Sequence, residues 1–481
     1  MMPLTVAELV RQVSGTFTGP GVDTRTATIT DVVVDSRLVG PGALFVALPG
    51  ERVDGHDYVP RAAELGAVAA LTSRPVPGAG CVVVADPQIA LGQVARRVTD
   101  DARAGRLTVL ALTGSAGKTT TKDLLAQLLE PVGPTVAPVG SFNNEIGLPL
   151  TACRVDPTTR FLVAEMGARG IGHIGYLCGI TPPDVGLVLN VGTAHLGEFG
   201  TREAIAVAKG ELVQALPAAG VAVLNAGDPL VAAMASRTSA RTVFFTVDPA
   251  GRAGSHPEVQ VWAEALDVDD LGRWRFRLVT PTGAADVALQ TIGRHQVDNA
   301  LAAAAAVSAI GFDPAETAAR LSGATARSRW RMEVHERSDG VVVVNDAYNA
   351  NPDSMRAVLN SWSKFGSGWR SLSPVLQTWA LLGEMLELGD QSDAEHTAVG
   401  AYAAGLGVSK LVAIGQNAHS VATGALRTNA TGEGVEVVPD KAAAAEYVAA
   451  RLQAGDVVLV KASRGVGLET VAERLLSEAT A

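Results

Sequence analysis

Cysteine and aromatic residues are both scarce in this chain of 481 residues. Its three cysteines, Cys81, Cys153 and Cys178, are an odd number without the spacing of a metal site. This argues against a disulfide framework and favours a reduced, cytoplasmic protein. Aromatic residues make up only 4% of the chain, whereas alanine, glycine and valine abound. The composition favours helices of small residues packed on strands of β-branched residues.

Excess positive charge and long apolar runs are missing as well. The formal net charge is −10 at pH 7, which argues against nucleic acid as a general partner, because neutralising phosphates needs a basic surface. The opening residues, MMPLTVAELV, lack the basic and apolar segments of a signal peptide. No run of about 18 apolar residues occurs, so we expect no membrane span and interpret ALAAAAAVSAI as a buried helix. We expect a cytoplasmic monomer.

Lysine is the rarer basic residue, with only 7 lysines among the 39 lysines and arginines. Arginine is therefore the default cation of this chain, and a lysine marks a position where a compact ammonium is specifically required. Lys118 and Lys122 lie in or just after a glycine-rich loop, and Lys209 and Lys461 lie beside other polar motifs.

The chain is too long for one hydrophobic core, and its texture changes twice. Short strands and loops occupy the first hundred residues, and apolar strands then alternate with helices, which is typical of a parallel, doubly wound sheet. A second alternating block begins near residue 327. We therefore predict three α/β domains, at 1–104, 105–326 and 327–481. Residues 364–378, rich in Gly, Ser and Trp, are interpreted as an exposed loop.

The segment LTGSAGKTTTK, residues 112–122, lies between an apolar strand and a helix. The commonest phosphate loop, G-x-x-x-x-G-K-[ST], needs a glycine where this chain has Leu112, so the loop here is a shorter one. In such a loop the N–H groups at the helix start hold phosphate, Lys118 reaches the outer phosphates and Thr119 binds Mg²⁺. The alternative is a glycine-rich turn without a ligand. The order strand, loop and helix favours ATP binding, by Gly114, Ser115, Ala116, Gly117, Lys118, Thr119 and Thr120.

Three further residues are candidates for a metal site beside this loop. Glu165 ends an apolar strand, as a carboxylate that holds the metal of a bound nucleotide does. His195 also follows an apolar strand, and Lys209 lies on a predicted helix. None is specific alone, because a strand-end carboxylate facing water, a hydrogen-bonded histidine and a solvated lysine remain open alternatives.

Polar residues also follow other apolar strands, in the segments LNAGDP, NDAYNANPDSM and KASRG. Ligands of open α/β sheets bind beyond the carboxyl ends of the strands, so these residues suit sugar hydroxyls, phosphate or a substrate carboxylate. Turn formation is the alternative, although the second segment is long and polar for a minimal turn. The side chains concerned are Asn225, Asp228, Asp346, Asn349, Asn351, Lys461, Ser463 and Arg464.

The short phosphate loop resembles that of the Mur ligases and their folylpolyglutamate synthase relatives. Other segments match this family in the expected order: SFNNEIGLP, EMGARGIGHI, AHLGEFG, AKGEL, GRHQVDNALAA and GEMLELGD. The resemblance covers almost the whole chain, and DSR…GALFVALPGERVDGHDY is similar to the family's uridine-nucleotide domain. It implies a small N-terminal α/β uridine-nucleotide domain, a central P-loop ATPase-like parallel-sheet domain and a C-terminal Rossmann-like domain.

The resemblance further implies an ATP-dependent amide ligase of peptidoglycan synthesis. In the type that matches best, ATP phosphorylates the terminal carboxylate of UDP-MurNAc-tripeptide, and the amine of D-alanyl-D-alanine attacks the acyl phosphate to give UDP-MurNAc-pentapeptide. An amino-acid ligase of the same superfamily and a nucleotide-gated binding protein that makes no amide remain alternatives. The third peptide residue, diaminopimelate or lysine, stays open.

Roles for individual residues also follow from the resemblance. Lys118 and Thr119 would handle the γ-phosphate and Mg²⁺, with Glu165 and His195 completing the metal sites. Lys209 matches the lysine that is carbamylated in Mur ligases, a change that turns an ammonium into a carboxylate-like metal ligand. The chain departs from the family pattern where KASR replaces KGSR and GEM replaces GDM.

The resemblance implies binding roles in all three predicted domains. His295 and Asn299 would meet the adenine, and Arg331 and Asp346 would reach ATP from the third domain, so we predict an open form that closes on its substrates. The residues expected at the uridine diphosphate are Ser36, Arg37, Asp54, Gly55 and His56. Those expected at the remaining substrate are Asn143, Asn144, Asn349, Lys461, Ser463 and Arg464.

Overall fold

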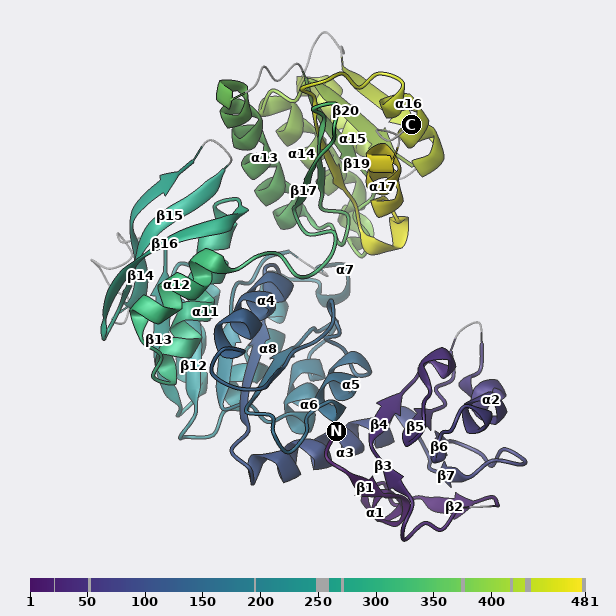
Figure 1. The fold of residues 1–481 in the computed structure, drawn as a ribbon. Helices are drawn as coiled ribbons and strands as arrows, with labels where there is room; N and C mark the ends of the chain where they lie inside the picture. The colour runs from purple at the N-terminus through teal and green to yellow at the C-terminus, as the bar shows by residue number, and fades with distance from the viewer. Residues whose placement is uncertain are drawn as a thin grey trace.

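The computed structural model describes residues 1–20, 22–50, 53–193, 196–247, 259–269, 272–372, 377–415, 418–428 and 434–477. Three α/β regions follow one another, and the central region contacts both others (Figure 1). The predicted three-domain α/β fold is confirmed. Among the described residues, no helix is both long and apolar enough to cross a membrane.

The N-terminal region is built on a five-stranded sheet in the order β2-β7-β6-β5-β4, parallel except for β2. A short antiparallel ribbon of β1 and β3 lies beside it. The strands are β1 (Leu4–Thr5), β2 (Thr16–Thr18), β3 (Thr28–Ile29), β4 (Asp31–Val33), β5 (Ala43–Val46), β6 (Ala69–Thr72) and β7 (Cys81–Val83). The α-helices are α1 (Val6–Gln12), α2 (Val59–Glu64) and α3 (Pro87–Arg103).

The central region has a nine-stranded sheet in the order β16-β15-β14-β13-β12-β11-β8-β10-β9. Its strands are β8 (Thr108–Thr113), β9 (Thr135–Val136), β10 (Phe161–Glu165), β11 (Val185–Val188), β12 (Val221–Asn225), β13 (Arg241–Thr246), β14 (Val259–Val268), β15 (Arg273–Thr280) and β16 (Gly283–Ile292). The strands from β9 to β14 pair in parallel, and β15 and β16 extend the sheet as antiparallel strands that we did not predict. The chain leaves β8 towards β10 on one side and returns to β11 on the other, so the end of β8 is a topological switch point where ligands bind.

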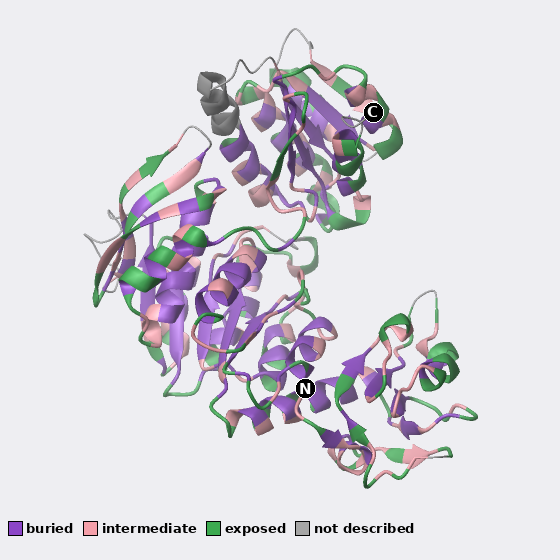
Figure 2. Cartoon of the chain, in the orientation of Figure 1, coloured by how far each residue is buried: buried purple, intermediate pink, exposed green. Residues whose placement is uncertain are grey.

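Helices cover both faces of this central sheet (Figure 1). They are α4 (Lys118–Leu129), α5 (Gly147–Cys153), α6 (His173–Ile180), α7 (Leu196–Phe199), α8 (Arg202–Lys209), α9 (Glu211–Gln214), α10 (Pro229–Ala232), α11 (His295–Ala309) and α12 (Pro314–Gly323). The helix predicted over 202–215 is therefore two helices, which meet at Gly210. The Ala-rich helix α11 is buried against the sheet, as predicted, because its small side chains let the backbone lie close to the strands (Figure 2).

The C-terminal region has a six-stranded sheet in the order β17-β18-β22-β19-β20-β21, parallel except for β17. Its strands are β17 (Glu333–Glu336), β18 (Val342–Asn345), β19 (Thr378–Leu382), β20 (Lys410–Ile414), β21 (Val435–Val438) and β22 (Val457–Lys461). Its α-helices are α13 (Pro352–Leu372), α14 (Ser392–Gly405), α15 (His419–Thr428), α16 (Lys441–Ala449) and α17 (Glu469–Ser477).

The loop predicted over 364–378 is wrong for most of its length. Helix α13 continues to Leu372, and residues 373–376 lie outside the described part of the chain. The prediction gave weight to Gly and Ser, which have low helix propensity, but the preceding helix continues through them to Leu372.

Candidate active site between the central and C-terminal regions

A cleft of about 980 Å³ lies between the central and C-terminal regions. Its walls come from loops at the carboxyl ends of strands on both sides, and from the first turn of α13. Most of the predicted ATP and substrate residues meet here, although they are widely separated in the sequence. The cleft is lined by Ser115, Ala116, Gly117, Lys118, Thr119, Thr120, Asn143, Asn144, Glu165, His295, Asn299, Arg331, Asp346, Asn349, Lys461, Ser463 and Arg464.

The phosphate loop joins the buried strand β8 to helix α4. Gly117 precedes the helix with φ of 82°, a left-handed conformation that favours glycine, and an added Cβ would lie 2.3 Å from Asn299 Oδ1. The first N–H groups of α4 have no partner within the helix and point towards the helix's N-terminal end. Lys118 Nζ donates to the Gly114 carbonyl at 2.7 Å, so its ammonium is folded back over the loop. This arrangement suits a phosphate.

Asn190, which follows β11, brackets the phosphate loop from the other side. Its Oδ1 accepts from Ala116 N at 2.9 Å, and its Nδ2 donates to the Ala116 carbonyl at 3.1 Å. Ser115 N also donates to the Asn190 carbonyl. We did not predict this role, although an Asn directly after an apolar strand is the same signal that we used for other residues.

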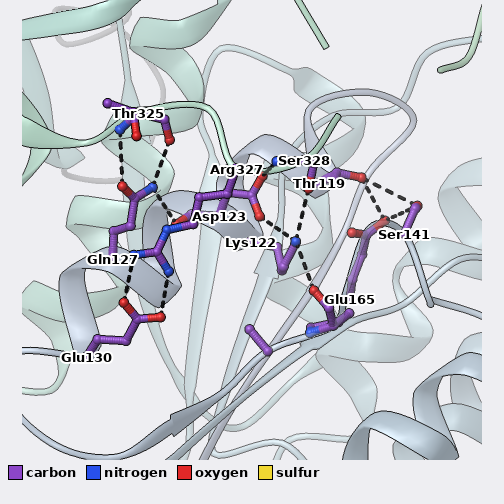
Figure 3. A network of polar contacts seen from close by, with 12 residues as sticks. Thr119, Lys122, Asp123, Gln127, Glu130, Ser141, Glu165, Thr325, Arg327 and Ser328 are labelled. Carbon is purple, nitrogen blue, oxygen red and sulfur yellow. Dashed lines mark hydrogen bonds and ion pairs between the residues drawn. The ribbon is translucent and has the colours of Figure 1, made fainter. Parts of the chain in front are cut away.

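Glu165 ends β10 and is fully buried at the foot of the cleft. Its Oε1 accepts hydrogen bonds from Asn143 Nδ2 at 2.7 Å, Ser141 Oγ at 3.0 Å and Thr119 Oγ1 at 3.3 Å (Figure 3). Its Oε2 is buried and has no hydrogen-bond partner among the described residues. A buried, unpartnered carboxylate oxygen beside a threonine hydroxyl fits a divalent cation, which favours oxygen ligands.

The other predicted metal residues are placed less directly. Lys209 lies at the end of α8 and is buried, and it makes no hydrogen bond or ion pair to any described residue. Removal from water, together with the nearby charge of Lys118, holds the pKa of Lys209 well below its ordinary value. His195 lies outside the described residues. Within the described ranges, no three His, Cys, Asp or Glu side chains gather as a metal-binding cluster.

Burial also lowers the pKa of Lys118, with the Glu165 carboxylate opposing the shift and the Arg331 guanidinium adding to it. Two amines of the central region, those of Lys118 and Lys209, therefore lie near each other with no carboxylate of the described residues in direct contact, and Lys118 lines the cleft. An uncompensated buried charge is costly unless a ligand of opposite charge binds. The local charge is right for polyphosphate although the whole chain is acidic.

On the C-terminal side, the polar residues bind one another. Lys461 Nζ donates to Asp346 Oδ2 at 2.5 Å and to the Asn349 carbonyl at 2.9 Å. Ser463 Oγ donates to the Ala350 carbonyl at 3.2 Å. Asp346 and Lys461, for which the resemblance implied separate ligands, thus form an ion pair with each other.

Two arginines project from this side into the cleft. The Arg464 guanidinium lies over the Trp330 ring, 4.2 Å from its centroid, and also pairs with Glu469. Arg331 lies 4.2 Å over the Tyr348 ring, and its Nε has no hydrogen-bond partner among the described residues. Both guanidinium groups are oriented by flat rings, which leaves donors for an anion.

The predicted adenine residues begin helix α11, beside the phosphate loop. Asn299 is buried, and its Nδ2 donates to Gln296 Oε1 at 3.0 Å. Burial lowers the pKa of His295 to about 4, with Asp346 opposing the shift and Lys461 adding to it, so the imidazole is neutral at pH 7. Its Nδ1 is buried and has no hydrogen-bond partner among the described residues.

The predicted uridine residues belong to the N-terminal region and do not line this cleft. Arg37, which follows Ser36, is exposed and pairs with Asp35. The His56 ring is buried, with Nδ1 on Asp54 at 2.6 Å and Nε2 accepting from Ser73 N at 2.9 Å. His56 therefore holds the loop around Gly55 in place, with both ring nitrogens occupied.

Two contacts that we did not predict join the walls of the cleft. Asp353, in the first turn of α13, accepts from Thr193 N at 2.7 Å and from Thr193 Oγ1 at 3.0 Å. Arg169 pairs with Glu387 at 3.4 Å. A charged residue at a helix start, such as Asp353, is ordinarily a surface feature, and no sequence pattern relates Arg169 to Glu387, so the sequence predicts neither contact.

Comparison with protein families gives three matches that together cover most of the chain. The model described as Mur ligase family, catalytic domain matches residues 28–110, and Mur ligase middle domain matches residues 112–307. Mur ligase, glutamate ligase domain matches residues 330–464.

Relatives and solved structures agree with these matches. UDP-N-acetylmuramoyl-tripeptide–D-alanyl-D-alanine ligase of Mycobacterium tuberculosis (strain ATCC 25618 / H37Rv) is 44% identical over 100% of this chain and 99% of the relative. The enzyme of that name in Escherichia coli (strain K12) is 33% identical over the full length of both. MurF from Acinetobacter baumannii superposes with a TM-score of 0.84 at 30% identity, over 99% of each chain. MurF ligase from Thermotoga maritima, solved in complex with ADP, has a TM-score of 0.76 at 28% identity, over 94% of this chain and 98% of that one.

The motif resemblance is thereby confirmed along the chain, from the N-terminal region to the last strand of the C-terminal sheet. The family match includes the short phosphate loop, the glutamate that ends β10 and the lysine of α8. The chain belongs to the Mur ligase family.

Proposed function

We propose that this protein joins D-alanyl-D-alanine to UDP-MurNAc-tripeptide with the hydrolysis of ATP to ADP and phosphate. The relatives at 44% and 33% identity carry this activity in their names. The observation that carries the proposal is the phosphate loop beside Glu165, whose Oε2 is buried and unpartnered, in a cleft that a second domain completes.

Phosphoryl transfer requires charge neutralisation and alignment more than covalent chemistry. The N–H groups of the loop and the Lys118 ammonium would bind the β- and γ-phosphates, and Arg331 would approach them from the C-terminal side. Thr119 and Glu165 would hold Mg²⁺, which when bound neutralises phosphate oxygens. We propose that His195 also binds metal, as the family pattern implies.

The substrate carboxylate would attack the γ-phosphorus, and the bond to the bridging oxygen of ADP would break. The resulting acyl phosphate is an activated carbonyl, so the amine of the dipeptide can add to it, lose a proton and expel phosphate. Water would destroy this intermediate, which gives the two-domain cleft its function as a shielded space.

Lys209 is proposed to carry a carbamate. Its lowered pKa favours the neutral amine, which is the form that makes an N–C bond to CO₂ and releases a proton. The product is an anion beside Lys118, whose ammonium disfavours a second positive charge there. Formate or acetate would partly restore activity to a Lys209→Ala variant, because a small carboxylate can occupy the vacated space; a variant with no rescue would contradict this role.

Binding roles on the remaining walls are also proposals. Asn143, Asn144, Asn349 and the Arg464 guanidinium would face the peptide. In the N-terminal region, the uridine diphosphate would be bound by Ser36, Arg37, Asp54, Gly55 and His56. Lys461 and Ser463 support the C-terminal wall of the cleft through their contacts with Asp346 and Ala350. The monomeric state belongs to the same set of proposals.

The deciding experiment measures phosphate release from ATP with UDP-MurNAc-tripeptide present, with D-alanyl-D-alanine or D-alanine added, and confirms the product by mass. Release and pentapeptide formation only with the dipeptide are expected. Ligation of the single amino acid would move the protein to another specificity within the family, and no ligation with either amine would contradict the proposal.

A further inference from the structure

The segment that joins the central to the C-terminal region is bound along one face of helix α4. This helix begins with the phosphate loop. Its residues Asp123 and Gln127, and Glu130 that caps its C-terminal end, lie four and three positions apart, which places them on one face. Each contacts a residue of the segment that follows α12, from Thr325 to Ser328 (Figure 3). We call this set of contacts the α4 clasp.

The clasp is polar along its length but differs in burial from end to end. At the exposed end, Arg327 makes two hydrogen bonds to Glu130, at 2.6 and 2.7 Å. In the middle, the Gln127 amide donates to the Thr325 carbonyl at 3.0 Å and accepts from Thr325 N at 3.1 Å. These two hydrogen bonds resemble the reciprocal pair between opposite residues of antiparallel strands. They fix the position of the segment along the axis of the helix.

The buried end of the clasp holds Ser328. Its N–H donates to Asp123 Oδ2 at 3.0 Å, and its Oγ accepts from Lys122 Nζ at 3.3 Å. Lys122 pairs with Asp123 and also donates to the Pro138 carbonyl at 3.1 Å. All three side chains are at least nine-tenths buried. A buried ion pair defines position more than it adds stability, because both charges need their partners in place.

Two residues further on, the chain is bound to the C-terminal region instead. The Trp330 carbonyl accepts from Tyr348 N at 3.2 Å, and Met332 N donates to Asp346 Oδ1 at 3.0 Å. Trp330 and Met332 have φ of 59° and 50°, the left-handed region that non-glycine residues adopt only when their surroundings impose it. Arg331 stands between these two restrained residues.

The backbone of Arg329 is therefore the connection between two anchored segments. It makes no backbone hydrogen bond to any described residue, and its side chain is exposed and pairs with Glu473 of α17. Ser328 before it is bound to α4, and Trp330 after it is bound to the C-terminal region.

From these contacts we infer that Lys122 and Asp123 are positioning residues: they fix Ser328 to the phosphate-loop helix, so that the C-terminal region turns about Arg329 and Arg331 is set against the phosphate loop. The inference rests on the role proposed above for Arg331 at ATP. Lys118 and Asp123 belong to the same helix, so the group that binds phosphate and the group that places Arg331 share one rigid element. Arg331 and the phosphate loop line the same cleft.

The test is a double-mutant cycle on the full-length protein with Asp123→Ala, Arg331→Ala and the combined variant. Asp123→Ala is expected to lower kcat/KM for ATP about tenfold to a hundredfold, because misplacement by about 1 Å has effects of that size. In the Arg331→Ala background the same substitution is expected to change kcat/KM less than about threefold, since its target is gone. A merely structural role would give the same factor in both backgrounds.

Two further variants separate positioning from stability. Gln127→Ala breaks the middle of the clasp without disturbing the buried ion pair, and we expect it to reduce kcat/KM in the same direction, and again only when Arg331 is present. Asp456→Asn is the matched control: this buried carboxylate of the C-terminal region accepts from Gln377 N and Trp379 Nε1, away from the clasp. It is expected to lower the melting temperature and to leave the cycle unchanged.

The outcomes are distinguishable. Equal effects of Asp123→Ala or Gln127→Ala with and without Arg331 would overturn the inference, as would an Arg331→Ala variant as active as the unmodified protein. Failure of the proposed function would show earlier, as absence of ligation by the unmodified protein. Isothermal titration of ATP into the same four proteins then repeats the cycle on binding alone, and additive binding free energies there would also count against the clasp.

Discussion

Both walls of the cleft are built from loops at the carboxyl ends of strands, but they differ in whether their charged groups are paired. On the central side, the half-buried Lys118 amine and the buried Lys209 amine contact no carboxylate of the described residues, and Glu165 Oε2 is buried without a hydrogen-bond partner among them. On the C-terminal side, Lys461 is as buried as Lys209 but pairs with Asp346. The difference lies in the partner and not in the residue type.

This contrast indicates which charges are there for a ligand. A buried charge without a partner destabilises the fold and persists only where binding compensates it. The two charges of a buried ion pair already compensate each other, so removing one of them lowers the stability of the fold first. We therefore expect substitutions on the central wall to affect activity before stability, and substitutions of the paired lysine to do the reverse.

The largest expected effect is that of Lys118→Met. Loss of the ammonium that we propose for phosphate binding is expected to reduce kcat about a thousandfold, the upper range for loss of one charge-stabilising group. Because the variant no longer removes an unpaired charge from water, its melting temperature is expected to stay level or rise. Steady-state kinetics and calorimetry test the two halves, and a strongly destabilised variant would contradict the contrast.

Lys461→Met is expected to act mainly on stability. It leaves the Asp346 carboxylate, which is 15% exposed, without its ion-pair partner, at a cost of up to about 3–5 kcal/mol in the free energy of unfolding. Replacing both, as Lys461→Met with Asp346→Leu, is expected to recover most of that loss. Urea unfolding of the three proteins measures it; if the single variant unfolds like the unmodified protein, the pair is not what holds this wall.

A smaller effect is expected from Asn143→Ala. Asn143 donates to Glu165 Oε1 and so orients Oε2 towards the proposed Mg²⁺. Loss of such a supporting hydrogen bond weakens metal binding about tenfold to a hundredfold. The Mg²⁺ concentration at half-maximal phosphate release is expected to rise by that factor, while ATP affinity measured without Mg²⁺ stays unchanged. An equal loss of ATP affinity without metal would place Asn143 on the nucleotide instead.

The smallest expected effect is on the pH dependence of stability, through His295. Its pKa is about 4 when folded and near 6.5 when unfolded, so the unfolded chain binds the extra proton between these values. The stability of the folded form therefore falls as the pH drops from about 6.5 to about 4. Burial raises the pKa of nearby Asp298 to about 6, and that group acts in the opposite direction.

The measurement is therefore a comparison of His295→Gln with the unmodified protein, by melting temperature over this pH range. The variant is expected to lose less stability on acidification. Identical slopes for the two proteins would show that the imidazole is protonated to the same degree in the folded and unfolded states.

Sequence reasoning reached the parts of the site that depend on local order. The phosphate loop follows from glycine spacing between a strand and a helix, and Glu165 follows from its place at a strand end. The pairing of Lys461 with Asp346 could not be predicted, because two oppositely charged residues 115 positions apart give no sign that their strands adjoin. The contact of Asp353 was not predicted for a related reason, because its partner Thr193 lies in another domain.

The fold, like the site, was predicted only where the local sequence pattern is strong. Alternating apolar strands and helices identified both parallel sheets, whose strands are buried on two faces and appear as continuous apolar runs. The strands β14 to β16 alternate in burial instead, a weaker signal that we did not use. For His56 the motif gave the location but not the role, because burial of a ring is not visible in sequence.

The single backbone connection at Arg329 limits the freedom of the whole C-terminal region. Each residue contributes two soft torsion angles, so two bodies anchored at Ser328 and Trp330 are linked by only a few rotational degrees of freedom. Such a joint permits turning and very little translation, since one residue spans at most about 3.6 Å. An inserted residue at this point would add two torsion angles and allow a few ångströms of translation between the two regions. The length of the connection is thus itself a constraint on how repeatably the two walls of the cleft meet.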